Sequence, residues 1–262
     1  PRRLRPPPPR AARARTRARS ASLGYSGIAR AAAVFAKVPV LSCSSAALLA
    51  LASATRLFSS SAASASAAPD AADKCARIEE RIQRDEGGRG IQGFCIPGEL
   101  ERASVDLAKA NSVAILTGFP ALLDFDQPQE TDGPPGAVAI ARACLALGKT
   151  VKIVTDDVNY PVIAAAAKEL TDANKGITVL SFPPGPSWGA EEDKAVDALA
   201  RSVDHVVAIE RTGPSADGRY YTMRVRDMTR IVAPLEKIVE IAAGLGKATT
   251  GIGDGGNELG MG

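Results

Sequence analysis

The sequence has a single histidine, His205, and few cysteines, and this scarcity limits the chemistry that its sites can use. A zinc site made of histidines and a Ser–His–Asp triad are both disfavoured when only one imidazole is present. The four cysteines, Cys43, Cys75, Cys95 and Cys144, form no C-x-x-C pair. We therefore expect reduced thiols in a reducing compartment. His205 precedes an apolar run, and we expect it to have a structural role.

Acidic residues are absent from the first part of the chain. Residues 1–69 carry no Asp or Glu but ten Arg and one Lys, so they contribute +11 to a whole-chain charge of +3, which leaves −8 on residues 70–262. An acid-free leader rich in Arg, Ala and Ser is typical of an organelle transit peptide, and Thr55–Ala62 (TRLFSSSA) resembles a mitochondrial processing site. We expect a location in the mitochondrial matrix, with a plastid or a secretory leader as alternatives. Because the first residue is Pro1, we also expect residues before it to be missing.

Other absences exclude whole classes of function. Aromatic residues make up only 4% of the chain, and the body is acidic, which disfavours a nucleic-acid partner. The apolar run Val38–Thr55 is interrupted by Pro39 and several serines, so we expect no membrane span. The sequence contains no G-x-x-x-x-G-K-[ST] motif. We therefore expect no nucleotide cofactor.

Three regions follow from the change in composition. Residues 1–69 are expected to be a transit peptide or low-complexity leader, and residues 70–97 a linker with a short helix over residues 73–85. Residues 98–262 begin with a second predicted helix and form the globular domain. The apolar runs in this domain predict strands over residues 112–119, 149–157, 176–182, 204–211 and 247–253.

Helices are expected between these strands, over residues 134–148, 160–173, 189–203 and 233–246. Continuous apolar strands that alternate with helices are typical of a parallel sheet covered on both faces. The predicted fold is α/β: a doubly wound, Rossmann-like sheet of about five mostly parallel strands, truncated at the C-terminus and preceded by a disordered leader. In such a sheet, ligands bind beyond the carboxyl ends of the strands.

The glycine-rich terminal segment GIGDGGNELGMG begins at the end of the last predicted strand and continues as a loop after it. It formally contains the G-x-G-x-x-G pattern of dinucleotide sites, but Asp254 would repel a pyrophosphate and the loop does not follow the first strand. Asp254, Asn257 and Glu258 instead suit an ammonium group or a hard divalent metal ion, with Asp254 and Glu258 as its ligands. The alternative is a tight turn in which Asp254 and Asn257 cap a following helix.

Two further groups of residues are expected at the same edge of the sheet. Asp132 precedes a helix whose first backbone N–H groups, around Gly133 and Gly136, could hold a substrate carboxylate, unless Asp132 merely caps that helix. Glu210 and Arg211 end a buried strand, where a charged pair suits either a binding site or a structural ion pair. The segment DGRYYTMR, residues 217–224, suits anion binding or a plain surface loop.

The topology predicts that these groups share one cleft. Carboxyl ends of parallel strands meet at one edge, so Asp254, Asn257 and Glu258 are expected beside Asp132 and Glu210. Several acids in one cleft repel each other, so some of their pKa values should be raised unless a cation lies among them.

The motifs GFP…QETDGPPGA, DHVVAIERTGPSADGRYY and TTGIGDGGNELGMG resemble the C-terminal domain of the mitochondrial D-glutamate cyclase family, in the same order, over roughly residues 98–262. The resemblance implies conversion of D-glutamate to 5-oxo-D-proline with loss of water, in a domain that continues past Gly262. It also implies a companion N-terminal cyclase domain, which is not evident between the leader and residue 98.

Cyclisation requires a base, oxyanion donors and an acid for the departing water. The candidate catalytic residues are Glu210, Glu258 and Asp254, with Glu210 or Glu258 expected as the base and Asp254 expected to hold the amine with Asn257. The candidate substrate-binding residues are Asp132, Gly133, Gly136, Arg211 and Asn257. The alternative function is a regulatory module that binds an amino acid or a nucleotide without turning it over.

Overall fold

The computed structural model describes residues 40–42, 69–85, 87–173 and 176–261. Its centre is a parallel sheet in the order β1-β6-β5-β2-β3-β4. The strands are β1 (Val40–Ser42), β2 (Ser112–Gly118), β3 (Thr150–Asp156), β4 (Ile177–Phe182), β5 (His205–Arg211) and β6 (Ala248–Gly253). The α/β fold and its five predicted parallel strands are confirmed.

Strand β1 was not expected, since it lies inside the region assigned to the leader. It pairs with β6 in parallel, with Val40 opposite Gly251 and Ser42 opposite Gly253. The transit-peptide cleavage site, expected within residues 55–62, lies outside the described residues.

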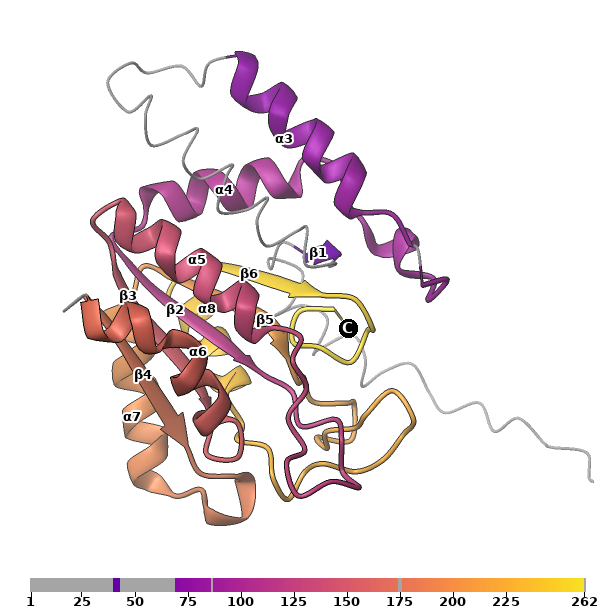
Figure 1. Ribbon diagram of the computed structural model, residues 1–262, viewed down its shortest axis with the longest axis vertical. Coiled ribbons are helices and arrows are strands. Elements are labelled where there is room, and N and C mark those ends of the chain that lie inside the picture. Colours follow the sequence, from indigo (N-terminus) through magenta and orange to yellow (C-terminus); the bar gives the residue numbers. More distant parts are fainter. Residues whose placement is uncertain (1–39, 43–68, 86, 174–175, 262) are drawn as a thin grey trace, which may run out of the picture.

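Helices cover both faces of the sheet (Figure 1). They are α3 (Pro69–Ile82), α4 (Glu99–Lys109), α5 (Pro134–Ala146), α6 (Tyr160–Ala173), α7 (Ala190–Ser202) and α8 (Glu236–Gly244), with short 3-10 turns at Ile91–Phe94 and Gly185–Ser187. The helices α4, α5 and α6 share one buried cluster with alternate residues of β2, such as Ile115. Helices α7 and α8 share the other cluster with the intervening residues, such as Leu116. Strands buried on both faces explain why their sequences are continuously apolar.

Helix α3 ties the predicted linker to the body. The Glu79 carboxylate on α3 accepts hydrogen bonds from the backbone N–H groups of Gly98 (2.8 Å) and Leu100 (2.9 Å), at the start of α4. The Gly98 N-cap has no side chain of its own for this purpose, so a carboxylate from another helix satisfies these N–H groups. This attachment fixes the segment after α3 relative to the sheet.

Helix α8 starts three residues later than its sequence pattern predicts. The N–H of Ala233 donates to the buried Asp156 carboxylate (2.6 Å) instead of beginning the helix. Among the described residues, no helix is long and apolar enough to cross a membrane.

Candidate active site

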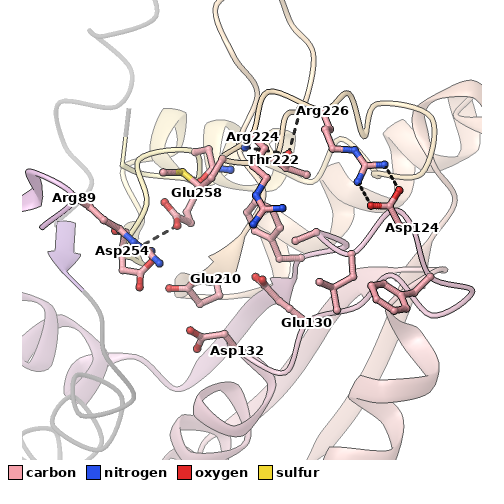
Figure 2. A pocket seen from close by; sticks show the side chains of 16 residues that line it. Arg89, Asp124, Glu130, Asp132, Glu210, Thr222, Arg224, Arg226, Asp254 and Glu258 are labelled. Atoms are coloured by element: carbon pink, nitrogen blue, oxygen red, sulfur yellow. Dashed lines mark hydrogen bonds and ion pairs between the residues drawn. The ribbon is translucent and has the colours of Figure 1, made fainter. Parts of the chain in front are cut away.

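A cavity of about 360 Å³ opens beyond the carboxyl ends of β2, β5 and β6 (Figure 2). This volume is in the range of small-molecule sites. Its lining includes charged side chains of both signs. The lining residues are Arg89, Phe119, Ala121, Leu122, Asp124, Phe125, Glu130, Asp132, Glu210, Thr222, Met223, Arg224, Arg226, Asp254, Asn257 and Glu258. The cleft shared by Asp132, Glu210 and the terminal loop, expected from topology, is therefore present.

Glu210 lies at the end of β5, almost completely buried at 3% exposure. Its backbone has φ 42°, a conformation that residues other than glycine rarely adopt and that the surrounding structure must enforce. Gly133 approaches it closely: a Cβ at Gly133 would lie 2.8 Å from the Glu210 Cβ and 2.9 Å from Thr117 Oγ1. Glycine at residue 133 therefore leaves the space that Glu210 occupies, which is a structural contribution from a residue expected to bind substrate directly.

The carboxyl of Glu210 is held in an unfavourable place for a charge. Its Oε1 is buried and has no hydrogen-bond partner among the described residues. Burial, as the largest cause, and the neighbouring carboxylates of Glu258, Asp132 and Asp254 together raise the pKa of Glu210 to about 9. At neutral pH this group is therefore a carboxylic acid when no cation is bound, able to donate a proton.

Glu258 is anchored by its own loop. Its carboxylate accepts hydrogen bonds from the N–H groups of Gly255 (2.8 Å) and Gly256 (2.7 Å). A Cβ at Gly255 would lie 2.7 Å from Glu258 Oε1, so glycine is needed there for the close approach. The loop is held to the end of β5, where the Leu259 N–H donates to the Arg211 carbonyl (2.6 Å). Two backbone donors thus fix one carboxylate in the cleft.

The two other polar residues of the loop do not act as helix caps. Asp254 accepts from the Arg89 guanidinium, and Asn257 Nδ2 donates to the Tyr221 carbonyl (2.8 Å). No helix begins within the described part of the loop. The helix-cap interpretation is therefore wrong for this loop up to Met261.

Arg89 was missed at the sequence level, where residues 70–97 were interpreted as a linker. It stands between Gly88 and Gly90, both with positive φ, and the Asp85 carboxylate accepts from the N–H groups of Arg89 (2.9 Å) and Gly90 (2.6 Å). This turn directs the side chain to Asp254, where it forms an ion pair at the cleft wall (Figure 2). A single arginine in a glycine-rich segment was the only sequence signal for it.

Glu130 and Asp132 approach the cleft from the loop after β2. Burial and the nearby Asp132 raise the pKa of Glu130 to about 7. Burial also raises the pKa of Asp254, although Arg89 opposes this shift. The raised pKa values expected for this cleft are therefore present, but burial contributes more to them than the mutual repulsion of the acids.

The start of helix α5 offers little to a substrate carboxylate. The Gly133 N–H donates to the Asp132 carboxylate (2.9 Å), and the next two residues, Pro134 and Pro135, have no N–H. Asp132 does not cap the helix itself, because Gly133 is the N-cap and has no side-chain cap. Gly136 lies buried in the first helical turn and does not line the cavity. This geometry does not favour anion binding at Gly133 and Gly136.

Arg211 does not line the cavity either. Its guanidinium is completely enclosed and forms a two-pronged ion pair with Asp156, with Nη2 2.8 Å from Asp156 Oδ1 and Nη1 also on that carboxylate. Nη2 also donates to the Ala233 carbonyl (2.6 Å). The structure therefore favours the structural ion pair over a substrate-binding role for Arg211.

A hairpin forms the opposite, basic wall of the cavity. Thr222 N–H donates to the Arg226 carbonyl (2.9 Å), and Tyr221 and Asp227 form an antiparallel bridge. At its tip, Arg226 forms a bidentate ion pair with Asp124 of the loop after β2, with Nη2 2.8 Å from Asp124 Oδ1. This ion pair closes the cavity on one side (Figure 2).

Glu210, Asp254 and Glu258 form an acidic wall of the cavity whose geometry could receive a cation. One carboxylate oxygen from each of Glu210, Asp254 and Glu258 lies within 4.8 Å of the other two. An ammonium group or a hard divalent metal ion among them would relieve their mutual repulsion. The unpartnered oxygen of Glu210 is a suitable acceptor or ligand for either.

Comparison with known proteins identifies the family of this chain. A sequence profile of the family described as "D-glutamate cyclase-like, C-terminal" matches residues 78–262. The chain is 39% identical over 202 residues to human "D-glutamate cyclase, mitochondrial", an alignment that covers 75% of this chain and 33% of the human protein. The chain thus spans about a third of that relative. Since the profile covers most of the chain, including every residue that lines the cavity, the chain belongs to the D-glutamate cyclase-like C-terminal family.

Proposed function

We propose that this chain catalyses the intramolecular dehydration of D-glutamate to 5-oxo-D-proline. The observation that carries the proposal is the buried carboxylic acid of Glu210, next to an anchored carboxylate and across from an arginine-bearing wall. A zwitterionic amino acid with a second carboxylate needs both kinds of wall. The human relative, a D-glutamate cyclase by name, supports the same substrate.

The reaction moves two protons from nitrogen to oxygen. The α-amine attacks the γ-carboxyl carbon and forms the lactam C–N bond, while one C–O bond breaks and that oxygen leaves as water. Two of the three ammonium protons therefore leave the nitrogen, and the departing oxygen carries both away. The protein must accept protons from the nitrogen and return them to the oxygen. Because only protons move and one C–N bond replaces one C–O bond, the reaction needs no oxidant or reductant.

The carboxyl groups of the cleft divide these tasks. The substrate ammonium lies among Asp254, Glu258 and Glu210, and Asp254 or Glu258 accepts its proton. Glu210 gives its proton to the γ-carboxylate oxygen, which makes the carbon electrophilic and the oxygen a better leaving group, and it regains a proton from the nitrogen after the attack. The proton held by Asp254 or Glu258 then passes to the same oxygen, which leaves as water. Holding the two ends of glutamate in contact supplies much of the remaining acceleration.

Incubation of the full chain with D-glutamate is expected to yield 5-oxoproline, measured by chromatography against a sample with L-glutamate. A companion domain would be required for turnover if the folded chain binds D-glutamate, by calorimetry, without forming product. That result would favour the binding-module alternative for this chain alone. Neither binding nor product would reject D-glutamate as its ligand.

A divalent metal ion is a second candidate for the acidic wall, favoured by the three converging oxygens. Glu210, Asp254 and Glu258 would hold it, and it would polarise the γ-carboxyl group when bound. The same assay in EDTA and in added Mg²⁺ or Mn²⁺ separates the two arrangements. Full turnover in EDTA favours the ammonium site, and restoration by the metal favours the metal site.

We also propose a mitochondrial location, supported by the acid-free leader and by the name of the human relative. A fusion of residues 1–75 to a fluorescent reporter is expected to enter mitochondria and to be shortened near Phe58. A matched fusion that starts at residue 76 should stay in the cytosol. Cytosolic fluorescence of the longer fusion would contradict the proposal.

A further inference from the structure

Three arginines line the cavity, and two of them already have carboxylate partners. Arg89 is paired with Asp254, and Arg226 is paired with Asp124. Among the described residues, Arg224 is the arginine of this cavity for which no ion pair is found. Its side chain extends from the hairpin toward the acidic wall (Figure 2). It is the guanidinium that remains available to an incoming anion.

The hairpin fixes the backbone on both sides of Arg224. The N–H groups of Arg224 and Arg226 both donate to Thr222 Oγ1, at 3.3 and 3.2 Å. Thr222 is itself buried at 8% exposure, so this acceptor is rigidly placed. The N–H of Val225 donates to the Thr222 carbonyl (2.8 Å).

Val225 shows that this shape is enforced. It has φ 59°, which is an outlier for a β-branched residue. Val225 is 78% exposed, so packing of its side chain does not explain this backbone conformation. Such strain persists where the surrounding structure fixes the backbone, here through Thr222 and the Arg226–Asp124 ion pair. The consequence of this backbone is that Arg224 faces the cleft while its neighbour is directed outward.

We propose that Arg224 binds the α-carboxylate of the substrate and thereby determines which enantiomer is used; this rests on the proposed cyclase function. A guanidinium suits a carboxylate because it offers two parallel N–H donors. The ammonium group binds at the acidic wall, and the γ-carboxylate binds at Glu210. The α-carboxylate, which does not react, is left for the opposite wall.

This arrangement holds three different substituents of the α-carbon. The ammonium is held by Asp254 and Glu258. The α-carboxylate is held by Arg224, and Glu210, beside the ammonium, donates to the γ-carboxylate at the end of the side chain. The opposite enantiomer can satisfy any two of these contacts, but it cannot satisfy all three while its amine and γ-carboxyl group are in contact. Arg224 therefore provides the third contact on which stereoselectivity depends.

The test compares Arg224→Gln and Arg224→Lys with Arg219→Gln in the full chain. Arg219 is a matched control because it lies on the same hairpin, is exposed, and is 3.5 Å from Asp227 without lining the cavity. Arg224→Gln should raise the KM for D-glutamate about 10- to 100-fold, since a charge-assisted contact is lost. Arg224→Lys should recover part of this loss, and Arg219→Gln should leave the KM unchanged.

Stereoselectivity gives a readout that a structural role would not move. In Arg224→Gln, the ratio of kcat/KM for D-glutamate to that for L-glutamate should fall, while the melting temperature stays within a degree or two of the parent. A parent chain that turns over D-glutamate, with Arg224→Gln unchanged in KM and in this ratio, would overturn the role of Arg224 alone. A folded parent chain that neither binds nor converts D-glutamate would overturn the cyclase function together with it.

Discussion

Replacement of Glu210 by glutamine is expected to lower the rate of 5-oxoproline formation by about 100- to 10,000-fold, the usual contribution of a general acid. Glutamine keeps the shape of the side chain but has no acidic proton to transfer to the γ-carboxylate. The KM should change less than kcat, because the amide still fills the same space. Steady-state kinetics at pH 7 measure both constants.

Glu240→Gln is the matched control. This glutamate on α8 also has a pKa raised by burial, but it does not line the cavity. It should retain the parental rate. A Glu210→Gln variant with full activity would show that Glu210 is not the proton donor, and Glu130, whose pKa is raised to about 7, would then be tested in the same way.

The same variant gives a stability readout that does not depend on the substrate. The folded state holds the Glu210 proton up to about pH 9, whereas the unfolded chain releases it near the ordinary value of 4.5. Between these two values the folded state binds the extra proton, so this group makes folding stability fall as pH rises. Glu210→Gln has no such dependence and should melt above the parent, by a margin that grows from pH 5 to pH 9.

Thermal denaturation in EDTA at several pH values measures this margin, at about 2–4 °C for each kcal/mol in a chain of this size. EDTA removes any cation that would stabilise the charged carboxylate. A margin that is the same at pH 5 and pH 9 would show that Glu210 is ionised in the empty cleft throughout this range.

The sheet could be predicted because burial on both faces leaves a direct trace in the sequence. Strands such as Ser112–Gly118 and His205–Arg211 must be apolar at successive positions, and turns rich in glycine separate them from helices. The three-residue strand Val40–Ser42 leaves no such trace. It is too short for a pattern, and its pairing with β6 comes from tertiary contact.

The acidic wall could also be predicted, because the ends of parallel strands meet at one edge whatever their distance in sequence. Arg89 could not be predicted in this way. It follows no strand, and only the packing of α3 against α4, through Glu79, brings its turn to the cleft. Contacts of this kind depend on how helices dock and are not encoded in the sheet topology.

The different roles of Glu210 and Arg211 could not be predicted from strand alternation. Adjacent residues of a regular strand direct their side chains to opposite faces. Glu210 departs from this pattern, because it has φ 42° and is an extra residue whose two neighbours in β5 pair with consecutive residues of β2. This irregularity leaves Glu210 at the cleft, while Arg211 is enclosed with Asp156.

Arg211→Lys and Asp156→Ala are therefore expected to act on folding. Removal of one partner of a fully buried ion pair leaves the other charge uncompensated and typically costs about 3–5 kcal/mol. Lysine at residue 211 cannot supply the two parallel donors that hold the Asp156 carboxylate, nor reach the Ala233 carbonyl at the same time. Both variants should unfold at clearly lower urea concentrations than the parent.

Asp197→Ala is the matched control, since it breaks the exposed ion pair with Arg201 on α7 and should cost less than about 1 kcal/mol. The decisive comparison is between urea unfolding and kinetics. If Arg211 stabilises the fold, the fraction of Arg211→Lys that remains folded should show an almost unchanged KM for D-glutamate, because the guanidinium never reaches the cavity. An unshifted unfolding midpoint with a KM raised tenfold or more would instead assign Arg211 to the substrate, and the ion pair with Asp156 would then have to open when the substrate binds.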